Sequence, residues 1–288
     1  MSEISISLAI QHTPWSIERR MFVTEIIKQL GGQQQIHKET VGFWIEKDID
    51  RAGCAPTFLK AIRRATLQTS SHFLLLQDDV KLCNNFLHII NQIIKANPTG
   101  IICLTTYGSS LPWIEKHQQL CMKFIEENNQ CLWIRSHSLR GAALIIPQIY
   151  LSSFLKWYSL YVKPNRRNGI DVLLGAFGGL NDIETLHVIP NPVLHLGRYS
   201  ENLQSYLNNR ACNNLLWHED CDSIDWSIFT NNTMSSPCRK VPFNTVKVSI
   251  PQDLYTKLLQ HPINSQSSNT NCLKSFLDKE AEATNRKA

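Results

Sequence analysis

Several common signatures of catalysis and binding are missing from this 288-residue chain. It contains no G-x-G-x-x-G or Walker A sequence, so neither a dinucleotide cofactor nor a P-loop kinase is expected. It has no G-x-S-x-G turn, which disfavours an α/β-hydrolase. Residues 11–15 do not resemble the Gly-rich loop that opens a sugar-nucleotide pyrophosphorylase. These common nucleotide-binding and hydrolase classes are therefore set aside.

Membrane and metal-cluster signals are also absent. No apolar run is long enough to span a bilayer, and the first residues lack the basic start and apolar region of a signal peptide. The nine cysteines are scattered and form no C-x-x-C pair, so a structural zinc site is not expected. Cys83, Cys103 and Cys131 lie in apolar segments. This usage favours reduced thiols in a cytoplasmic protein.

Charge is sparse and slightly basic. Charged residues make up 18%, and Lys plus Arg exceed Asp plus Glu by 29 to 24, a net charge of +5. This balance suits an anionic ligand but does not by itself indicate a nucleic-acid partner. Hydrophobic residues make up 43%, and a chain of this length can bury a core without disulfides or structural metals.

The first half alternates strand-like and helix-like segments. The run Phe73 to Leu76 is continuously apolar, as in a strand buried on both faces, and Ser16 is placed to cap a helix. This alternation predicts an α/β fold with a mixed, mainly parallel sheet flanked by helices. Strands are expected at residues 4–10, 41–46, 72–76 and 100–104, and helices at 17–30, 57–67 and 84–96. The first helix is expected to bury Ile17, Phe22, Ile26, Ile27 and Leu30, and the second Phe58, Ile62 and Leu67.

The second half is more mixed and becomes irregular. Strands are expected at residues 131–134, 142–146, 186–190, 193–194 and 246–250, and helices at 148–161, 171–177, 201–217 and 252–259. Residues 218–244 are expected to be irregular. The pattern divides the chain into a main domain over residues 1–202, an extension over 203–263 packed on it, and a polar tail over 264–288.

An acidic pair follows the most apolar strand. Asp78 and Asp79 cannot both continue into the core, because a buried unpaired carboxylate is very costly. They are therefore expected at the carboxyl end of the strand, where α/β sheets bind ligands. Their mutual repulsion favours a divalent cation, and carboxylate oxygens suit Mg²⁺ or Mn²⁺. Alternatively, Asp79 caps the next helix.

The segment Gln77-Asp78-Asp79-Val80-Lys81-Leu82-Cys83, with Phe86, resembles the metal-binding DxD-type region of GT-A glycosyltransferases. The similarity is closest to the small glycosyltransferase-like proteins of bacteriophages and large DNA viruses. It implies a GT-A-like fold in which Gln77 faces the nucleoside. Asp78 and Asp79 would hold Mn²⁺ or Mg²⁺ and the diphosphate of a nucleotide-sugar. Gln77 departs from the Asp or Glu that many members carry at this position.

In the family, the base and ribose of the donor lie against the loop that follows the first strand. The resemblance assigns Gln11 and Thr13 to the donor site and lets Arg19 or Arg20 reach a phosphate. The alternative is that both arginines lie on a solvated helix face.

Small residues before the strand at 142–146 give a further match. In the family, a Gly-Ala pair such as Gly141-Ala142 lines the sugar pocket, because small residues let the donor approach the backbone. Close packing of a buried strand explains the pair equally well.

Two later residues complete the set. Asp171 resembles the acidic residue that inverting members use as general base near the acceptor, and helix capping is the alternative. His195 lies in residues 190–200, which resemble the family's "Pro, apolar pair, His, x, Gly, x, x, Ser" segment. There the His completes the metal shell. The alternative is a core histidine.

The resemblance covers residues 4–202. It implies metal-dependent transfer of a sugar from a nucleotide-sugar to a hydroxyl group, and a UDP-sugar is the expected donor. Among several acceptors, the viral similarity favours a hydroxymethylated pyrimidine in DNA, which the enzyme would flip out of the stack. The expected location is the cytoplasm, that of the host for a viral chain. The competing hypothesis is a non-catalytic nucleic-acid-binding or host-interaction protein on an inactive GT-A scaffold.

Overall fold

The computed structural model describes residues 3–106, 112–135, 139, 141–162, 169–196, 199–200, 205–206, 216–227, 233–237 and 245–249. The expected helix at 252–259 and the polar tail at 264–288 lie outside these residues.

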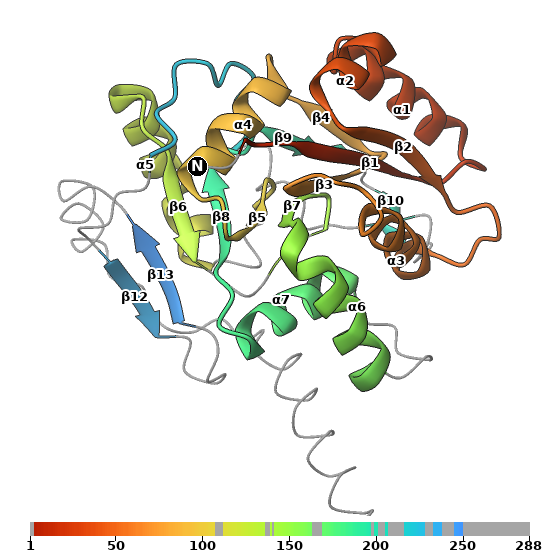
Figure 1. Cartoon of the computed structure of the whole chain (residues 1–288). Helices are drawn as coiled ribbons and strands as arrows, with labels where there is room; N and C mark the ends of the chain where they lie inside the picture. Colours follow the sequence, from red (N-terminus) through yellow and green to blue (C-terminus); the bar gives the residue numbers. More distant parts are fainter. Residues whose placement is uncertain are drawn as a thin grey trace, which may run out of the picture.

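One large sheet organises the described residues. Its nine strands follow the order β12-β13-β6-β8-β5-β7-β3-β1-β2 (Figure 1). The strands are β1 (Ile6–His12), β2 (Gly42–Lys47), β3 (His72–Gln77), β5 (Ile101–Cys103), β6 (Leu132–Arg135), β7 (Ala143–Pro147), β8 (Thr185–Ile189), β12 (Thr233–Pro237) and β13 (Thr245–Ser249).

The sheet is mixed, with one prevailing direction. Strand β1 pairs in parallel with β2 and β3, and β5 in parallel with β8. Strand β7 is antiparallel to both β3 and β5, and β6 is antiparallel to both β8 and β13. The described strands β1, β2, β3, β5, β8 and β13 therefore run one way, and β6, β7 and β12 the other. The predicted α/β fold with a mixed, mainly parallel sheet is confirmed.

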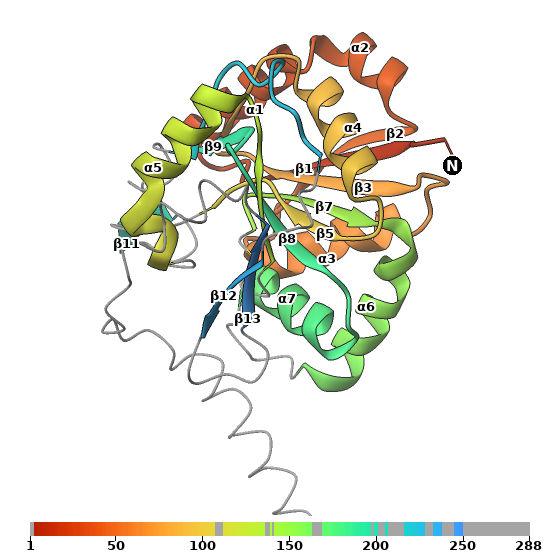
Figure 2. The same ribbon diagram turned by 90° about the vertical axis from the view of Figure 1, so that its left-hand side faces the viewer.

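Helices cover both faces of the sheet (Figure 2). They are α1 (Ile17–Gln29), α2 (Gly32–Glu39), α3 (Cys54–Ala65), α4 (Phe86–Ala96), α5 (Pro112–Asn128), α6 (Gln148–Tyr161) and α7 (Ile170–Leu180). Buried residues of α1, α2, α4 and α5 belong to one hydrophobic cluster, and those of α3, α6 and α7 to a second. The sheet thus separates two cores.

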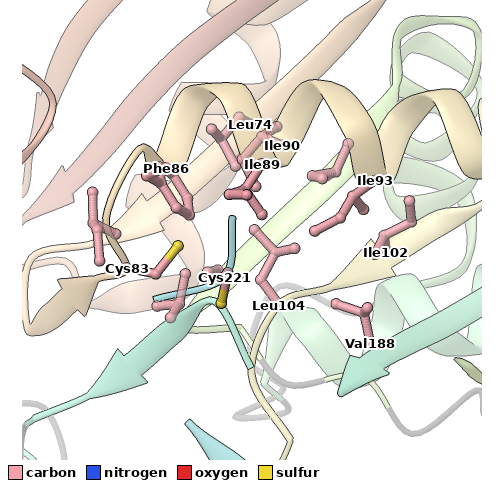
Figure 3. Close-up of a cluster of buried hydrophobic side chains, with 14 of the residues drawn as sticks. Leu74, Cys83, Phe86, Ile89, Ile90, Ile93, Ile102, Leu104, Val188 and Cys221 are labelled. Carbon is pink, nitrogen blue, oxygen red and sulfur yellow. The ribbon is translucent and has the colours of Figure 1, made fainter. Parts of the chain in front are cut away.

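The strands supply both cores by their two-residue alternation. In β3, Leu74 and Leu76 join the first cluster, whereas Phe73 and Leu75 join the second. Figure 3 shows part of the first cluster, with one face of α4 packed over Leu74. The run of apolar residues in β3 is continuous because the strand is covered on both faces.

The expected strands and helices up to residue 196 all form, with ends displaced by up to three residues in most cases. Helix α1 begins after Ser16, whose Oγ accepts a hydrogen bond from the backbone N–H of Arg19 (3.4 Å). Helices α2 and α5 and the short strand β4 (Val80–Leu82) were not expected. Helix α2 buries only Ile36 and so carries little apolar periodicity.

Three side-chain expectations were wrong. Ile17 is 70% exposed, and Arg19 is buried on the same helix instead. Leu67 is 81% exposed because α3 ends at Ala65. The alternative that Asp79 caps the next helix is also wrong, since Asn85 is the residue that precedes α4.

The later expectations fared unevenly. Strand β13 confirms the strand expected at 246–250, whereas β12 lies in the segment expected to be irregular. Within the expected helix 201–217, Ser205–Tyr206 forms strand β11 instead, paired with β10 (Tyr199–Ser200). Among the described residues, no helix is long and apolar enough to cross a membrane.

A buried histidine in β3 generates a prediction on stability. His72 donates from Nε2 to the carbonyl of Pro98 (2.9 Å). Burial lowers the pKa of His72, although the bond to Pro98 partly opposes this. The unfolded chain binds the proton more readily, so stability is present above the unfolded pKa of about 6.5 and is lost as the pH falls below it. His72→Gln is expected to reduce this loss.

The measurement is urea unfolding at pH 7.5 and 5.5. The control is His88→Gln, because His88 is exposed on α4 and its replacement is expected to leave the pH dependence unchanged. Equal pH dependence in wild type and His72→Gln would contradict the assignment.

Candidate active site

The acidic pair lies where two strands end side by side. Asp78 and Asp79 directly follow β3, and in the parallel pairing of β1 with β3 Gln77 is opposite Gln11. The carboxyl ends of both strands therefore meet at one edge of the sheet. The two carboxylates occupy the position that the sequence predicted for them.

Three groups from the end of β1 and the start of α1 bind Asp78. His12 Nδ1 lies 2.9 Å from Oδ2, and the backbone N–H of Thr13 donates to the same oxygen at 2.6 Å. Arg19 Nη1 donates to Oδ1 at 2.7 Å. Thr13, predicted to contact the donor, thus contacts the acidic pair through its backbone.

Arg19 joins the two carboxylates. Its Nη1 lies 2.7 Å from Asp78 Oδ1 and 2.7 Å from Asp79 Oδ2. Burial alone would lower the pKa of Arg19, but the negative charges of Asp79 and Asp78 outweigh it and raise the pKa. The residue is 9% exposed, so the alternative of a solvated helix face is wrong for Arg19. The solvated-face alternative is correct for Arg20, which is exposed.

His195 reaches the pair through a small second sheet. Strand β9 (Val193–His195) is antiparallel to β4, with His195 opposite Val80, and Leu196 N–H donates to the Asp79 carbonyl at 2.7 Å. This pairing brings His195 Nε2 to 2.8 Å from Asp79 Oδ2. The side chain is buried, as in the core-histidine alternative, but its partner is the acidic pair.

This arrangement does not fit a divalent cation held by Asp78, Asp79 and His195. A guanidinium nitrogen contacts both carboxylates, and the imidazole nitrogen that faces Asp79 donates to it, leaving that nitrogen without a lone pair for a metal. Among the described residues, no group of three or more His, Cys, Asp or Glu side chains is placed to hold a metal ion. The Mn²⁺ or Mg²⁺ site stays a prediction that the observed contacts do not favour.

Two glutamine side chains and a thiol lie beside the pair. Gln11 Nε2 donates to the carbonyl of Cys54 (2.7 Å) and lies 3.2 Å from its Sγ, while Gln77 Nε2 lies 3.7 Å from the same sulfur. Burial raises the pKa of Cys54 to about 11, a hydrogen bond from Gln11 opposes this, and the charges of Asp171, Asp79 and Asp78 add to it. Cys54 is therefore a protonated thiol near neutral pH, unsuited to act as a nucleophile.

Asp171 lies at the start of α7 and holds the segment before β7. Its Oδ2 accepts from Gly141 N–H (3.0 Å) and its Oδ1 from Val172 N–H (3.0 Å). Ala142 in turn accepts from Gln77 N–H at 2.8 Å. Gly141, Ala142 and Asp171 therefore adjoin the end of β3. The residue that precedes α7 is Gly169, so Asp171 lies in the first turn of the helix and not at its N-cap, and the capping alternative is wrong; its negative charge still lies at the favourable end of the helix dipole.

Gly169 leaves room for this carboxylate. A Cβ added at Gly169 would lie 2.4 Å from Asp171 Oδ1, closer than atoms can approach. Any larger residue there would force the Asp171 side chain to move. Gly169 thus permits the observed position of Asp171, and the N–H groups of Gly141 and Val172 hold it there.

Two residues of the site were not assigned from the sequence. His12 is 66 positions from its partner Asp78, and Cys54 is 43 positions from Gln11. Neither residue has a local pattern that marks it. Only the pairing of β1 with β3 and the placement of α3 bring them together.

No protein-family model and no curated protein matches the chain. Solved structures with some likeness include A197 from STIV, with a TM-score of 0.39 and 10% identity over 69% of this chain and 87% of that one. A protein from Bacillus anthracis assigned as a glucose-1-phosphate thymidylyltransferase has a TM-score of 0.37 and 6% identity, over 64% and 89%. Mouse xyloside xylosyltransferase 1 has a TM-score of 0.28 and 7% identity, over 75% and 85%.

The fold is of the mixed α/β class predicted from the sequence. Its sheet carries the antiparallel strand β7 between the parallel-running β3 and β5, and the acidic pair follows β3 at the edge where β1 also ends.

The buried charges generate a prediction on stability. Asp79→Asn removes one of the two buried charges that Arg19 faces, together with the carboxylate that His195 contacts, and should lower the free energy of unfolding by about 3 kcal/mol, the low end for one partner of a buried ion pair because Asp78 still faces Arg19. The control Glu219→Gln breaks an exposed pair with Lys81 (2.8 Å) and should cost less than about 1 kcal/mol. Urea unfolding of both variants measures this, and equal losses would contradict the buried network.

Proposed function

We propose that this chain is a glycosyltransferase that moves a sugar from a nucleotide-sugar, first of all a UDP-sugar, to an acceptor hydroxyl. The observation that carries the proposal is the convergence of Asp78, Asp79, Arg19 and Asp171 around the ends of β1 and β3 in a GT-A-like fold. Carboxylates, a buried cation and hydrogen-bonding amides at this edge are the groups that a charged, hydroxyl-rich donor needs.

The donor would lie along the ends of β1 and β3. Gln11 and Gln77 supply amide groups for the nucleoside, and Arg19 lies beside the proposed position of the diphosphate, with its Nη1 bound to both carboxylates. Gly141 and Ala142 offer little side-chain bulk, which allows the sugar close to the backbone. Arg19 contacts the acidic pair directly, whereas Gln11 bonds Cys54, Gly141 bonds Asp171 and Ala142 accepts from Gln77 N–H, next to Asp78 in the chain.

In the transfer step, the bond between the anomeric carbon and the diphosphate oxygen breaks, and its electron pair leaves with the diphosphate. The acceptor oxygen forms the new bond to the anomeric carbon and gives its proton to Asp171 if the configuration inverts. The N–H groups of Gly141 and Val172 hold the carboxylate in one orientation for this role. If the configuration is retained, Asp171 positions the acceptor instead.

The DNA acceptor remains a proposal with less support. A DNA backbone would bind to pairs of basic residues, which in this sequence include Arg19-Arg20, Arg63-Arg64 and the pairs at 166–167 and 239–240. Arg19 is bound to the acidic pair, and Arg63-Arg64 lies in the last turn of α3, at the opposite end from Cys54. The pairs at 166–167 and 239–240 lie outside the described residues. A hydroxymethylated pyrimidine is therefore one acceptor to test among other hydroxyl compounds.

One observation favours the competing function, a non-catalytic binding protein on the same scaffold. Asp78 and Asp79 already have protein partners, so the fold compensates their charge without any ligand. A scaffold that had lost its donor would still need these contacts in order to fold. Donor binding separates the two functions.

Nucleotide-sugars are expected to stabilise the protein against heat. A ligand present at 100 times its Kd adds about 2.7 kcal/mol to the free energy of unfolding. The measurement is a thermal-shift series with UDP-, GDP- and dTDP-sugars, with and without Mn²⁺, with uridine as a control for the nucleoside alone. No shift with any donor, together with salt-dependent binding to DNA, would support the binding protein instead.

Asp171→Asn is expected to leave donor affinity unchanged and to lower turnover by about 10²- to 10⁴-fold, since an amide cannot take the acceptor proton. Calorimetry with UDP-glucose measures affinity, and UDP release in the presence of water or hydroxymethylcytosine DNA measures turnover. The matched control is Asp182→Asn, because Asp182 is exposed just past the other end of α7. Loss of donor affinity in Asp171→Asn would place this residue in the donor site instead.

A further inference from the structure

The space between the two acidic side chains contains a positive charge of the protein itself. Arg19 Nη1 lies 2.7 Å from an oxygen of Asp78 and 2.7 Å from an oxygen of Asp79. A bridging divalent cation would have to contact the same two carboxylates. The guanidinium thus occupies the position that the repulsion between the carboxylates would otherwise assign to a metal.

The surrounding contacts hold Arg19 in this position. Asp78 also accepts from His12 and from Thr13 N–H, and Asp79 from His195, so donors from two separate parts of the chain hold the carboxylates in addition to Arg19. Asp78 is 3% and Asp79 is 1% exposed. A metal entering this pocket would have to displace a buried guanidinium and then lie beside its charge, which is strongly unfavourable where water is excluded.

The local sequence also determines where Arg19 lies on α1. Ser16 caps α1 and accepts from Arg19 N–H, so Arg19 lies in the first turn of the helix, directly after the loop that begins at Thr13 and follows His12 at the end of β1. Arg20, one position further, turns away and donates from Nη1 to the carbonyl of Pro14 (2.7 Å) at the surface. The two neighbouring arginines therefore provide a matched comparison.

We propose that Arg19, and not a divalent cation, is the resident positive charge of the acidic pair. For the proposed transfer, it follows that no divalent cation is bound at the acidic pair when the diphosphate departs, so that turnover needs no added metal. This second consequence rests on the proposed function, whereas the identity of the resident cation does not.

The first experiment uses the wild-type protein and Mn²⁺ alone. In a titration followed by electron paramagnetic resonance, free Mn²⁺ is expected to keep its full signal at protein concentrations up to the millimolar range. The melting temperature is expected to be the same in Mn²⁺ and in EDTA. Binding of one Mn²⁺ per chain that disappears in Asp79→Asn would overturn the proposal.

The second experiment removes the guanidinium. Arg19→Met leaves the two carboxylates without their shared cation, so its melting temperature should fall, and Mn²⁺ should then raise it. The control Arg20→Met should match wild type and ignore Mn²⁺. A folded Arg19→Met protein that gains no response to Mn²⁺ would overturn the proposal. If this variant does not fold, Arg19→Lys, which keeps the charge, should fold and remain insensitive to Mn²⁺; stabilisation of Arg19→Lys and wild type by Mn²⁺ would overturn it.

Donor binding keeps this proposal distinct from the proposed function. Stabilisation by UDP-glucose in EDTA supports both. Stabilisation only in Mn²⁺ supports the glycosyltransferase and overturns the role of Arg19. No stabilisation in either condition, with no Mn²⁺ binding, counts against the glycosyltransferase and supports Arg19 as the resident cation of a site with another use.

Discussion

The burial of two adjacent carboxylates is the constraint on which the rest of the site depends. Asp78 and Asp79 are almost fully enclosed, and two like charges at that depth are tolerated only with compensation. The compensation comes from Arg19 in the first turn of α1, from His12 at the end of β1 and from His195 at the end of β9. Three structural features bring these partners to the carboxylates: the capping of α1, the pairing of β1 with β3 and the pairing of β4 with β9.

The sheet makes these long-range contacts possible. Because β1 and β3 are parallel and adjacent, the loops that follow them emerge at the same edge, although the loops are more than 60 residues apart in the chain. Strand β7 pairs with β3 on the side away from β1, so Gly141 and Ala142, which directly precede β7, lie near the end of β3. The N–H of Gly141 donates to Asp171. The two hydrophobic cores hold the strands of the sheet in place, and the strands in turn position the polar side chains of the site.

Local patterns made the fold predictable, and long-range pairing limited the prediction of the site. The apolar run before Asp78 and the cap at Ser16 depend on near neighbours, so the sequence alone located β3 and α1. The repulsion between the carboxylates led to the prediction of a divalent cation, whereas the structure places Arg19 between them. The sequence alone did not identify Arg19 as the partner, because it lies 59 positions from Asp78 on a helix whose neighbouring residues suggest a solvated face. The polar helix α2 was missed for a related reason, since only Ile36 anchors it.

The last described strand has a consequence for the integrity of the sheet. Strand β13 pairs along β6, whose Leu132, Trp133 and Ile134 are all buried. A shortened chain that ended before Thr233 would leave β6 with unpaired N–H and C=O groups along an apolar strand. Such an edge is a template for a strand of another molecule. The C-terminal strands thus protect the sheet from self-association as well as completing it.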